Sequence, residues 1–90
     1  MIQLVEVVKN TRSYELREVF VNPRHVVMLR EDHATRSAIN EGKSIEGMDP
    51  RQQYTRVTVD NGTTGSQFIV VGSPGIVESK LKSGRQLLNG

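Results

Sequence analysis

The sequence predicts a mainly β (α+β) fold for a chain of 90 residues, with about five strands in an antiparallel sheet or small barrel and a short C-terminal helix. Three observations carry this prediction. Apolar and β-branched residues form five short runs, turn residues end several of these runs, and a capped helical pattern follows the last run. A long polar segment, residues 31–53, separates the third run from the fourth. We expect one domain, 1–90, with 31–53 as a loop or arm.

The first two runs, Ile2–Val8 and Leu16–Val21, are joined by the polar connection Lys9–Ser13, which predicts a β-hairpin. Asn22-Pro23 ends the second run, because proline fixes φ and has no N–H to donate to a sheet. A third strand is expected at His25–Arg30.

The fourth run, Tyr54–Asp60, alternates most clearly in the chain. Alternation places Thr55, Val57 and Val59 on one face, and Tyr54, Arg56 and Thr58 on the other. Asp60-Asn61-Gly62 is a strong turn signal, and Gln67–Val71 returns from it. A second hairpin is therefore expected.

The final element is predicted to be helical. Ser73 suits the N-cap and Pro74 the first helical position, and Gly84 is expected to end the helix. The turn Gly72-Ser73-Pro74-Gly75 stands where many proteins hold a phosphate, but it lacks the GxxxxGK[ST] and GxGxxG spacings. Pro74 also removes a donor. We interpret this turn as a structural corner.

Segment 31–53 is far longer than an ordinary hairpin loop of about 2–5 residues. Three interpretations are open. The favoured one is a flexible arm, because Gly42, Gly47 and Pro50 punctuate a polar stretch. The others are a short helix from Asp32 to Glu41 ended by Gly42, and a long β-arm extending the third and fourth strands.

Composition excludes several classes of protein. The chain has no cysteine, so disulfides and thiolate metal sites are excluded. It begins with no signal-peptide pattern, and no apolar run approaches the roughly 20 residues of a membrane span. We therefore expect a cytoplasmic protein with no membrane contact. A small core of Val, Ile and Leu without Trp favours self-association into a homo-oligomer.

The sequence shows no pattern of enzymatic chemistry. His33 stands beside Glu31 and Asp32, but adjacent residues of an extended chain point to alternate sides, so we expect no metal site there. There is no cysteine and no GxSxG motif for nucleophilic catalysis. We predict no enzyme, no catalytic residue and no cofactor.

Two binding roles remain. The first is a non-enzymatic protein-interaction or accessory module, with contacts from strand edges, from the segment 31–53 through Ile39, Ile45 and Met48, and from the C-terminal Leu87 and Leu88. The alternative is a small β-platform for RNA or single-stranded DNA. In that case Tyr54 would stack on a base while Arg56, on the same outward face, would contact phosphate.

Three stretches follow one another in a familiar order: FVNPRHVVMLRE, YTRVTVDNG and FIVVGSPGIVESKL. In this outline the chain resembles the small flagellar proteins of the FlbD type and many short phage and bacterial proteins. The resemblance implies a compact accessory factor of phage or bacterial origin. The chain departs from the flagellar pattern in its long first hairpin, in the insertion 31–53 and at Gly75.

Overall fold

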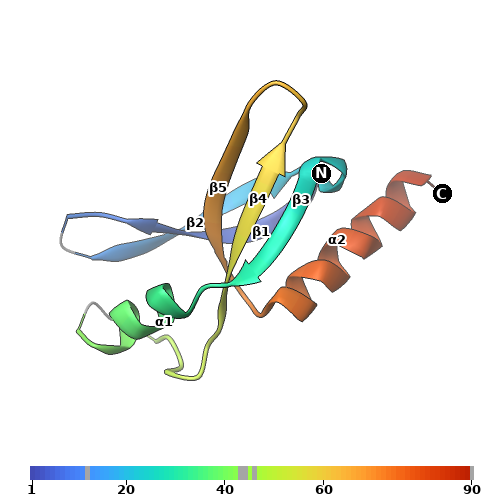
Figure 1. Ribbon diagram of the computed structural model, residues 1–90. Coiled ribbons are helices and arrows are strands. Elements are labelled where there is room, and N and C mark those ends of the chain that lie inside the picture. Colours follow the sequence, from blue (N-terminus) through green and yellow to red (C-terminus); the bar gives the residue numbers. More distant parts are fainter. Residues whose placement is uncertain (12, 43–44, 46, 90) are drawn as a thin grey trace.

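Five strands form one open antiparallel sheet, as Figure 1 shows for the computed structural model. The structure describes residues 1–11, 13–42, 45 and 47–89, with 84–89 described by their backbone alone. In chain order the elements are β1 (Ile2–Lys9), β2 (Tyr14–Val21), the 3-10 turn η1 (Pro23–His25), β3 (Val26–Glu31), α1 (His33–Asn40), β4 (Tyr54–Asp60), β5 (Gly65–Val71) and α2 (Pro74–Asn89). The strand order is β2-β1-β5-β4-β3, so the mainly β prediction is confirmed and the closed-barrel alternative is wrong.

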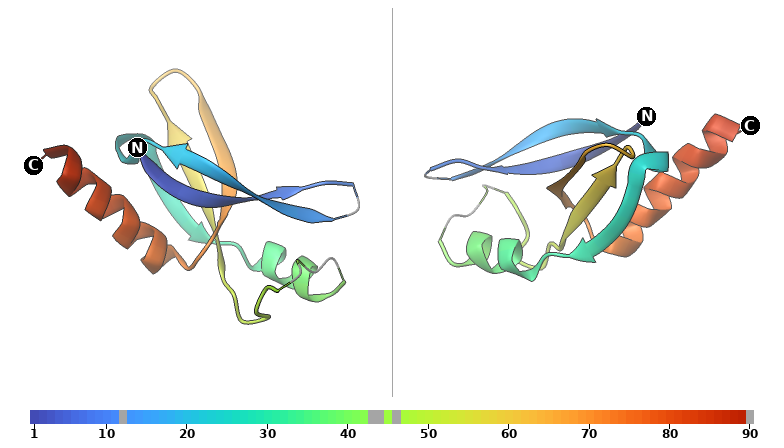
Figure 2. Two further views of the ribbon diagram at one scale, coloured as in Figure 1. Left: turned by 180° about the vertical axis from the view of Figure 1, so that it is seen from behind. Right: turned by 45° about the horizontal axis from the view of Figure 1, so that its top comes forward.

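The hairpin β1–β2 projects beyond the rest of the sheet. Its two strands pair along their whole length, from Ile2↔Val21 to Lys9↔Tyr14. In contrast, β1 pairs with β5 only at Glu6↔Val70 and Val7↔Ile69. The hairpin therefore crosses the β3–β4–β5 part of the sheet and extends past it, as both panels of Figure 2 show.

Each face of the sheet carries a hydrophobic cluster of its own. On one face, which we call the α2 face, Val77 and Leu81 of α2 pack against buried residues of the sheet (Leu4, Val21, Val57 and Val70). On the opposite face, the α1 face, Ile39 of α1 packs with Val7 and Tyr54. The strand registers place these clusters on opposite faces, because Thr55 pairs with Val70 while Tyr54 pairs with Val71.

Segment 31–53 contains a short helix, in agreement with one of the three interpretations. Asp32 precedes the eight residues of α1, and Gly42, with a φ of 152°, follows it. The extended β-arm is wrong, because β3 ends at Glu31 and β4 begins at Tyr54. The flexibility expected of this segment stays a prediction.

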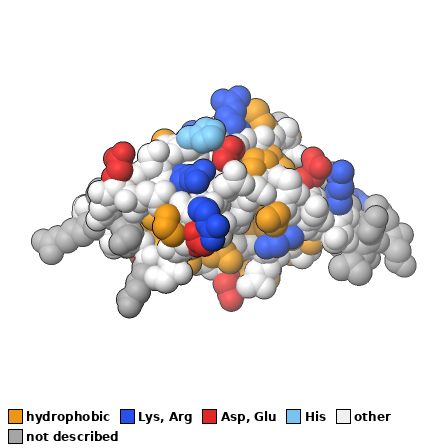
Figure 3. Space-filling view, turned by 90° about the horizontal axis from the view of Figure 1, so that it is seen from below, with side chains coloured by type: hydrophobic (Ala, Val, Ile, Leu, Met, Phe, Trp, Pro, Cys, Tyr) orange, Lys and Arg blue, Asp and Glu red, His pale blue; other side chains and the backbone are white. Residues whose placement is uncertain are grey.

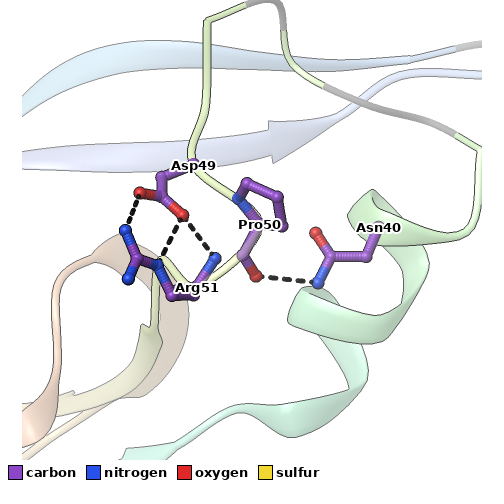
Figure 4. A network of polar contacts seen from close by, with 4 residues as sticks. All are labelled: Asn40, Asp49, Pro50 and Arg51. Atoms are coloured by element: carbon purple, nitrogen blue, oxygen red, sulfur yellow. Dashed lines mark hydrogen bonds and ion pairs between the residues drawn. The ribbon is translucent and has the colours of Figure 1, made fainter.

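Polar contacts tie the end of this segment to α1 (Figure 4). The Nδ2 of Asn40 donates to the Pro50 carbonyl oxygen over 3.0 Å. Asp49 accepts from the backbone N–H of Arg51 at 2.8 Å and from its guanidinium at 3.2 Å. The return to β4 is thus fixed by local hydrogen bonds.

The corner between β5 and α2 is built as the sequence indicates. The Oγ of Ser73 accepts from the N–H of Ile76 at 3.3 Å, as an N-cap does. Gly72 has a φ of 119°, and both its backbone groups are used inside the fold: its N–H donates to the Gln53 carbonyl, and its carbonyl accepts from the Thr55 hydroxyl. The expected stop at Gly84 is wrong, because α2 continues to Asn89. One glycine costs a helix only about 1 kcal/mol, which does not end it.

Candidate interaction surface

Tyr54 is a core residue and not a stacking platform. Only 1% of it is exposed, because α1 and the residues after it cover this end of the strand. Its hydroxyl is buried without a hydrogen-bond partner among the described residues, and burial raises the pKa of this hydroxyl. The expectation that Tyr54 presents its ring to a base is therefore wrong.

Arg56 lies on the same face, and there the expectation of exposure is correct: 45% of its side chain is exposed. Its guanidinium lies 3.6 Å from the Oδ2 of Asp32 and 3.4 Å from the Oε1 of Gln67. Asp32 itself is nine-tenths buried and also accepts from the Thr35 hydroxyl at 2.7 Å. This buried carboxylate holds the Arg56 side chain against the start of α1.

The residues expected to contact a partner from segment 31–53 face inward instead. Ile39 is only 3% exposed and belongs to the core, so its assignment as a contact residue is wrong. Ile45 and Met48 are half-buried and pack against the same cluster. Leu87 and Leu88 fall within α2, and their side chains lie outside the described residues.

The acidic residues around His33 do not converge. The Nε2 of His33 lies 3.3 Å from the Oε2 of Glu31, and the Oε1 of Glu31 accepts from the Gln53 amide at 2.9 Å. Asp32 turns away from them to Thr35 and Arg56. Across the described part of the chain, no three His, Cys, Asp or Glu side chains are grouped as metal ligands would be.

The hairpin β1–β2 carries exposed hydrophobic side chains that the sequence interpretation did not single out. Val5, Leu16 and Phe20 are 36%, 41% and 58% exposed. Val5 pairs with Glu18, so Leu16 and Phe20 are its two diagonal neighbours on the α1 face. These three residues form one strip, which we call the hairpin strip. The signal was present in the run IQLVEVV, which is apolar at positions facing both sides.

The strip lies beside an open sheet edge. β2 is the first strand in the sheet order, so its outer backbone groups pair with no other strand of the described chain. On the opposite face of β2, Glu15 and Arg17 form an ion pair of 3.3 Å along the strand. The Asn10 amide, which donates to Glu15 over 2.7 Å, and the charge of Arg17 together lower the pKa of Glu15.

Charges elsewhere are mixed. On the face shown in Figure 3, acidic and basic side chains are interspersed instead of being gathered by sign. In the part of the chain that the structure describes, neither helix combines the length and apolar character needed to cross a membrane.

Comparison with protein-family models, with curated proteins and with solved structures finds no match for this chain. The resemblance to FlbD-type proteins therefore stays a prediction.

Proposed function

We propose that this protein is a non-enzymatic interaction module that self-associates through β2. The observation that carries the proposal is the hairpin strip beside the open edge of β2. Unpaired strand edges are templates for pairing with another chain, and small sheets commonly extend across a twofold axis in this way. Two copies joined at β2 would form one continuous sheet, in which the two strips meet at their Leu16 ends.

The charges of β2 favour one register. In a twofold antiparallel pair, a residue at the axis faces its own copy, and its neighbours on either side face each other. With the axis at Leu16, each Glu15 faces the Arg17 of the second copy and the two Leu16 side chains meet. The pairing therefore has two Glu15–Arg17 contacts and one apolar contact at the axis, and it sets Tyr14 opposite the Glu18 of the second copy on either side.

Neighbouring registers place like charges together. An axis at Glu15, Arg17 or Glu18 sets that residue directly against its own copy. Like charges directly opposite across two strands destabilise the pair. The axis at Leu16 avoids this repulsion, which is why we choose it.

Charge reversal tests this arrangement. Glu15→Arg puts arginine against Arg17 twice in the dimer, and Arg17→Glu puts glutamate against Glu15 twice. Each opposite-charge pair is worth about 0.2–1 kcal/mol, so turning two attractions into repulsions costs roughly 1–4 kcal/mol. The dimer Kd of either variant should rise from about 5-fold to several hundred-fold. An equimolar mixture of the two variants restores both attractions and should dimerise again.

Light scattering after size exclusion, over a range of protein concentrations, measures the monomer–dimer equilibrium of the wild type and of each variant. Lys80→Glu on α2 is the matched control, because it makes the same charge change as Arg17→Glu away from β2. A wild-type protein that stays monomeric at high concentration refutes self-association. A wild-type dimer whose Kd neither variant changes refutes the register alone.

We also keep, as part of the proposal, an accessory role in a phage or in the bacterial cytoplasm. Its support is the resemblance of the strand and turn pattern to small flagellar proteins. Binding of RNA or single-stranded DNA would need a surface other than the Tyr54 ring, because that ring is buried.

A further inference from the structure

A groove of about 350 Å³ lies between the hairpin β1–β2 and α1. In Figures 1 and 2, the hairpin and α1 extend to the same side of the molecule, with the helix below the hairpin. Val7 and Ile69, which pair directly across β1 and β5, lie in the groove, and Ala34 and Ala38 of α1 line it on the helix side. Small-molecule sites commonly occupy about 300–1,000 Å³, so this groove can hold one compact ligand.

A positively charged side chain, that of Arg56, lines the groove where β4 lies beside α1. Arg56 reaches it with a guanidinium fixed by Asp32 and Gln67. Arg30 pairs directly with Arg56 across β3 and β4, which puts two like charges on neighbouring strands of the same face. Asp32 balances one of these two charges, so one cation remains in excess on this face.

The hairpin supplies a second cation beside an aromatic ring. Lys9 and Tyr14 are the last directly opposed pair of the hairpin, and both line the groove. The Tyr14 ring is half-buried. A second hollow, of about 430 Å³, shares Lys9, Tyr14 and Ala38 and continues past the end of α1 at Glu41 and Gly42. The hollowed surface is therefore longer than one compact ligand.

Asp32 adds a buried acceptor to these cations. Its contacts with Thr35 and Arg56 both use Oδ2, and Oδ1 has no polar contact within the described residues. Acidic side chains accept from the exocyclic amino group of cytosine, so this oxygen is a candidate acceptor for a base.

We propose that this groove binds a nucleotide unit, with the base against Tyr14 and the phosphate near Arg56 or Lys9. Stacking on an aromatic ring, together with cations that contact phosphate, is how proteins bind single strands without a basic face over the whole molecule. The unit could come from a free nucleotide or from single-stranded RNA or DNA, because both present the same base and phosphate.

Filling the groove tests the proposal without changing its charges. Ala38→Leu puts a larger side chain into the groove and keeps a strong helix former. Ser37→Leu, at the exposed neighbouring position of α1, is the matched control for an added leucine. Tyr14→Ala removes the ring, and Tyr14→Phe keeps the stacking surface.

The probes are fluorescein-labelled ten-nucleotide single strands of RNA and DNA, followed by anisotropy at low salt, and AMP, GMP, CMP and UMP, followed by calorimetry. We expect the wild type to bind at least one probe class. Ala38→Leu should weaken binding at least about 10-fold, and Tyr14→Ala about 5- to 100-fold. Ser37→Leu and Tyr14→Phe should change it less than about 2-fold. Circular dichroism checks that every variant is folded.

The two binding assays distinguish the possible sources of the nucleotide unit. Binding of oligonucleotides alone assigns the groove to single-stranded nucleic acid, and binding of mononucleotides assigns it to a free nucleotide. A wild type that binds neither probe at low salt overturns the proposal. Equal affinities of Ala38→Leu and Ser37→Leu also overturn it, since binding would then lie outside the groove.

Discussion

Replacing Tyr54 by phenylalanine should stabilise the protein, although tyrosine is one of its most buried residues. The Tyr54 side chain is 1% exposed, and its hydroxyl has no hydrogen-bond partner within the described residues. A buried polar group without a partner costs the folded state about 1–3 kcal/mol, since its hydrogen bonds to water are lost. Tyr54→Phe removes that group and keeps the ring that packs with Val7 and Ile39.

The cavity left by the missing hydroxyl oxygen slightly reduces this gain in the free energy of unfolding. A gap the size of one oxygen atom, roughly 15 Å³, costs about 0.4 kcal/mol at the cavity cost of about 24 cal/mol per Å³. We therefore expect the free energy of unfolding to rise by about 0.5–2.5 kcal/mol. In a domain of this size, 1 kcal/mol corresponds to about 4–8 °C in Tm.

The difference in stability between Tyr54→Phe and the wild type should grow at high pH. Burial raises the pKa of Tyr54, so the folded state holds the phenolic proton more tightly than the unfolded state does. The stability that this proton contributes is present below the unfolded pKa of about 10 and is lost as the pH rises above it. Tyr54→Phe has no such loss, so its advantage over the wild type should be larger at pH 11 than at pH 7.

Urea unfolding of both proteins at one protein concentration, at pH 7 and pH 11, measures these differences. Tyr14→Phe is the control, because Tyr14 is only half-buried. If Tyr54→Phe is less stable than the wild type at pH 7, the Tyr54 hydroxyl makes a stabilising hydrogen bond and the prediction is wrong.

Further predictions concern β4 and the first hairpin. Thr55→Val should lower the free energy of unfolding by about 1–3 kcal/mol in urea, because the Thr55 hydroxyl donates to the Gly72 carbonyl over 2.7 Å. Thr58→Val is the matched substitution and should be neutral or stabilising, because the Thr58 hydroxyl is buried with no partner in the described chain; equal losses for the two variants would contradict this. Asn10→Ala should raise the pKa of Glu15 in an NMR titration, since the Asn10 amide is the main cause of its lowered pKa. An unchanged Glu15 titration would show that Arg17 alone is responsible.

The sheet could be predicted because its signals are local. Asn22 accepts from the N–H of Arg24 at 3.0 Å before Pro23, and Asp60 accepts from the N–H of Gly62 at 2.7 Å in the second hairpin. Each contact joins residues close in sequence, and each falls at a turn that the sequence marks. The same is true of Ser73 at the start of α2.

The candidate site could not be predicted in the same way, since it depends on where α1 lies. Alternation correctly puts Tyr54 and Arg56 on one face, but it does not show that α1 covers Tyr54 and leaves Arg56 exposed. For Ile39, an informative signal was its spacing from Thr35, four residues earlier, because both are buried on one side of α1. That spacing argues for a packed helix and against an exposed contact residue.

The limited pairing of β1 with β5 explains why this small sheet has an exposed apolar surface on its first hairpin. Because the two strands pair only at Glu6 and Val7, the hairpin leaves the sheet before its apolar side chains are covered. A single cross-strand row on the α1 face, through Arg56, Ile69, Val7 and Leu16, joins the groove to the hairpin strip.

The two proposals therefore share one strand. Tyr14 lines the groove, and Leu16, two residues further along β2, lies at the proposed twofold axis. Ligand in the groove and pairing at the edge both act on β2, so they can be energetically coupled. By linkage, any factor by which a nucleotide changes the affinity of dimerisation must equal the factor by which dimerisation changes the affinity for that nucleotide. The edge strand β2, which carries Tyr14 toward the groove and would pair with the second copy, is the element through which such coupling would pass.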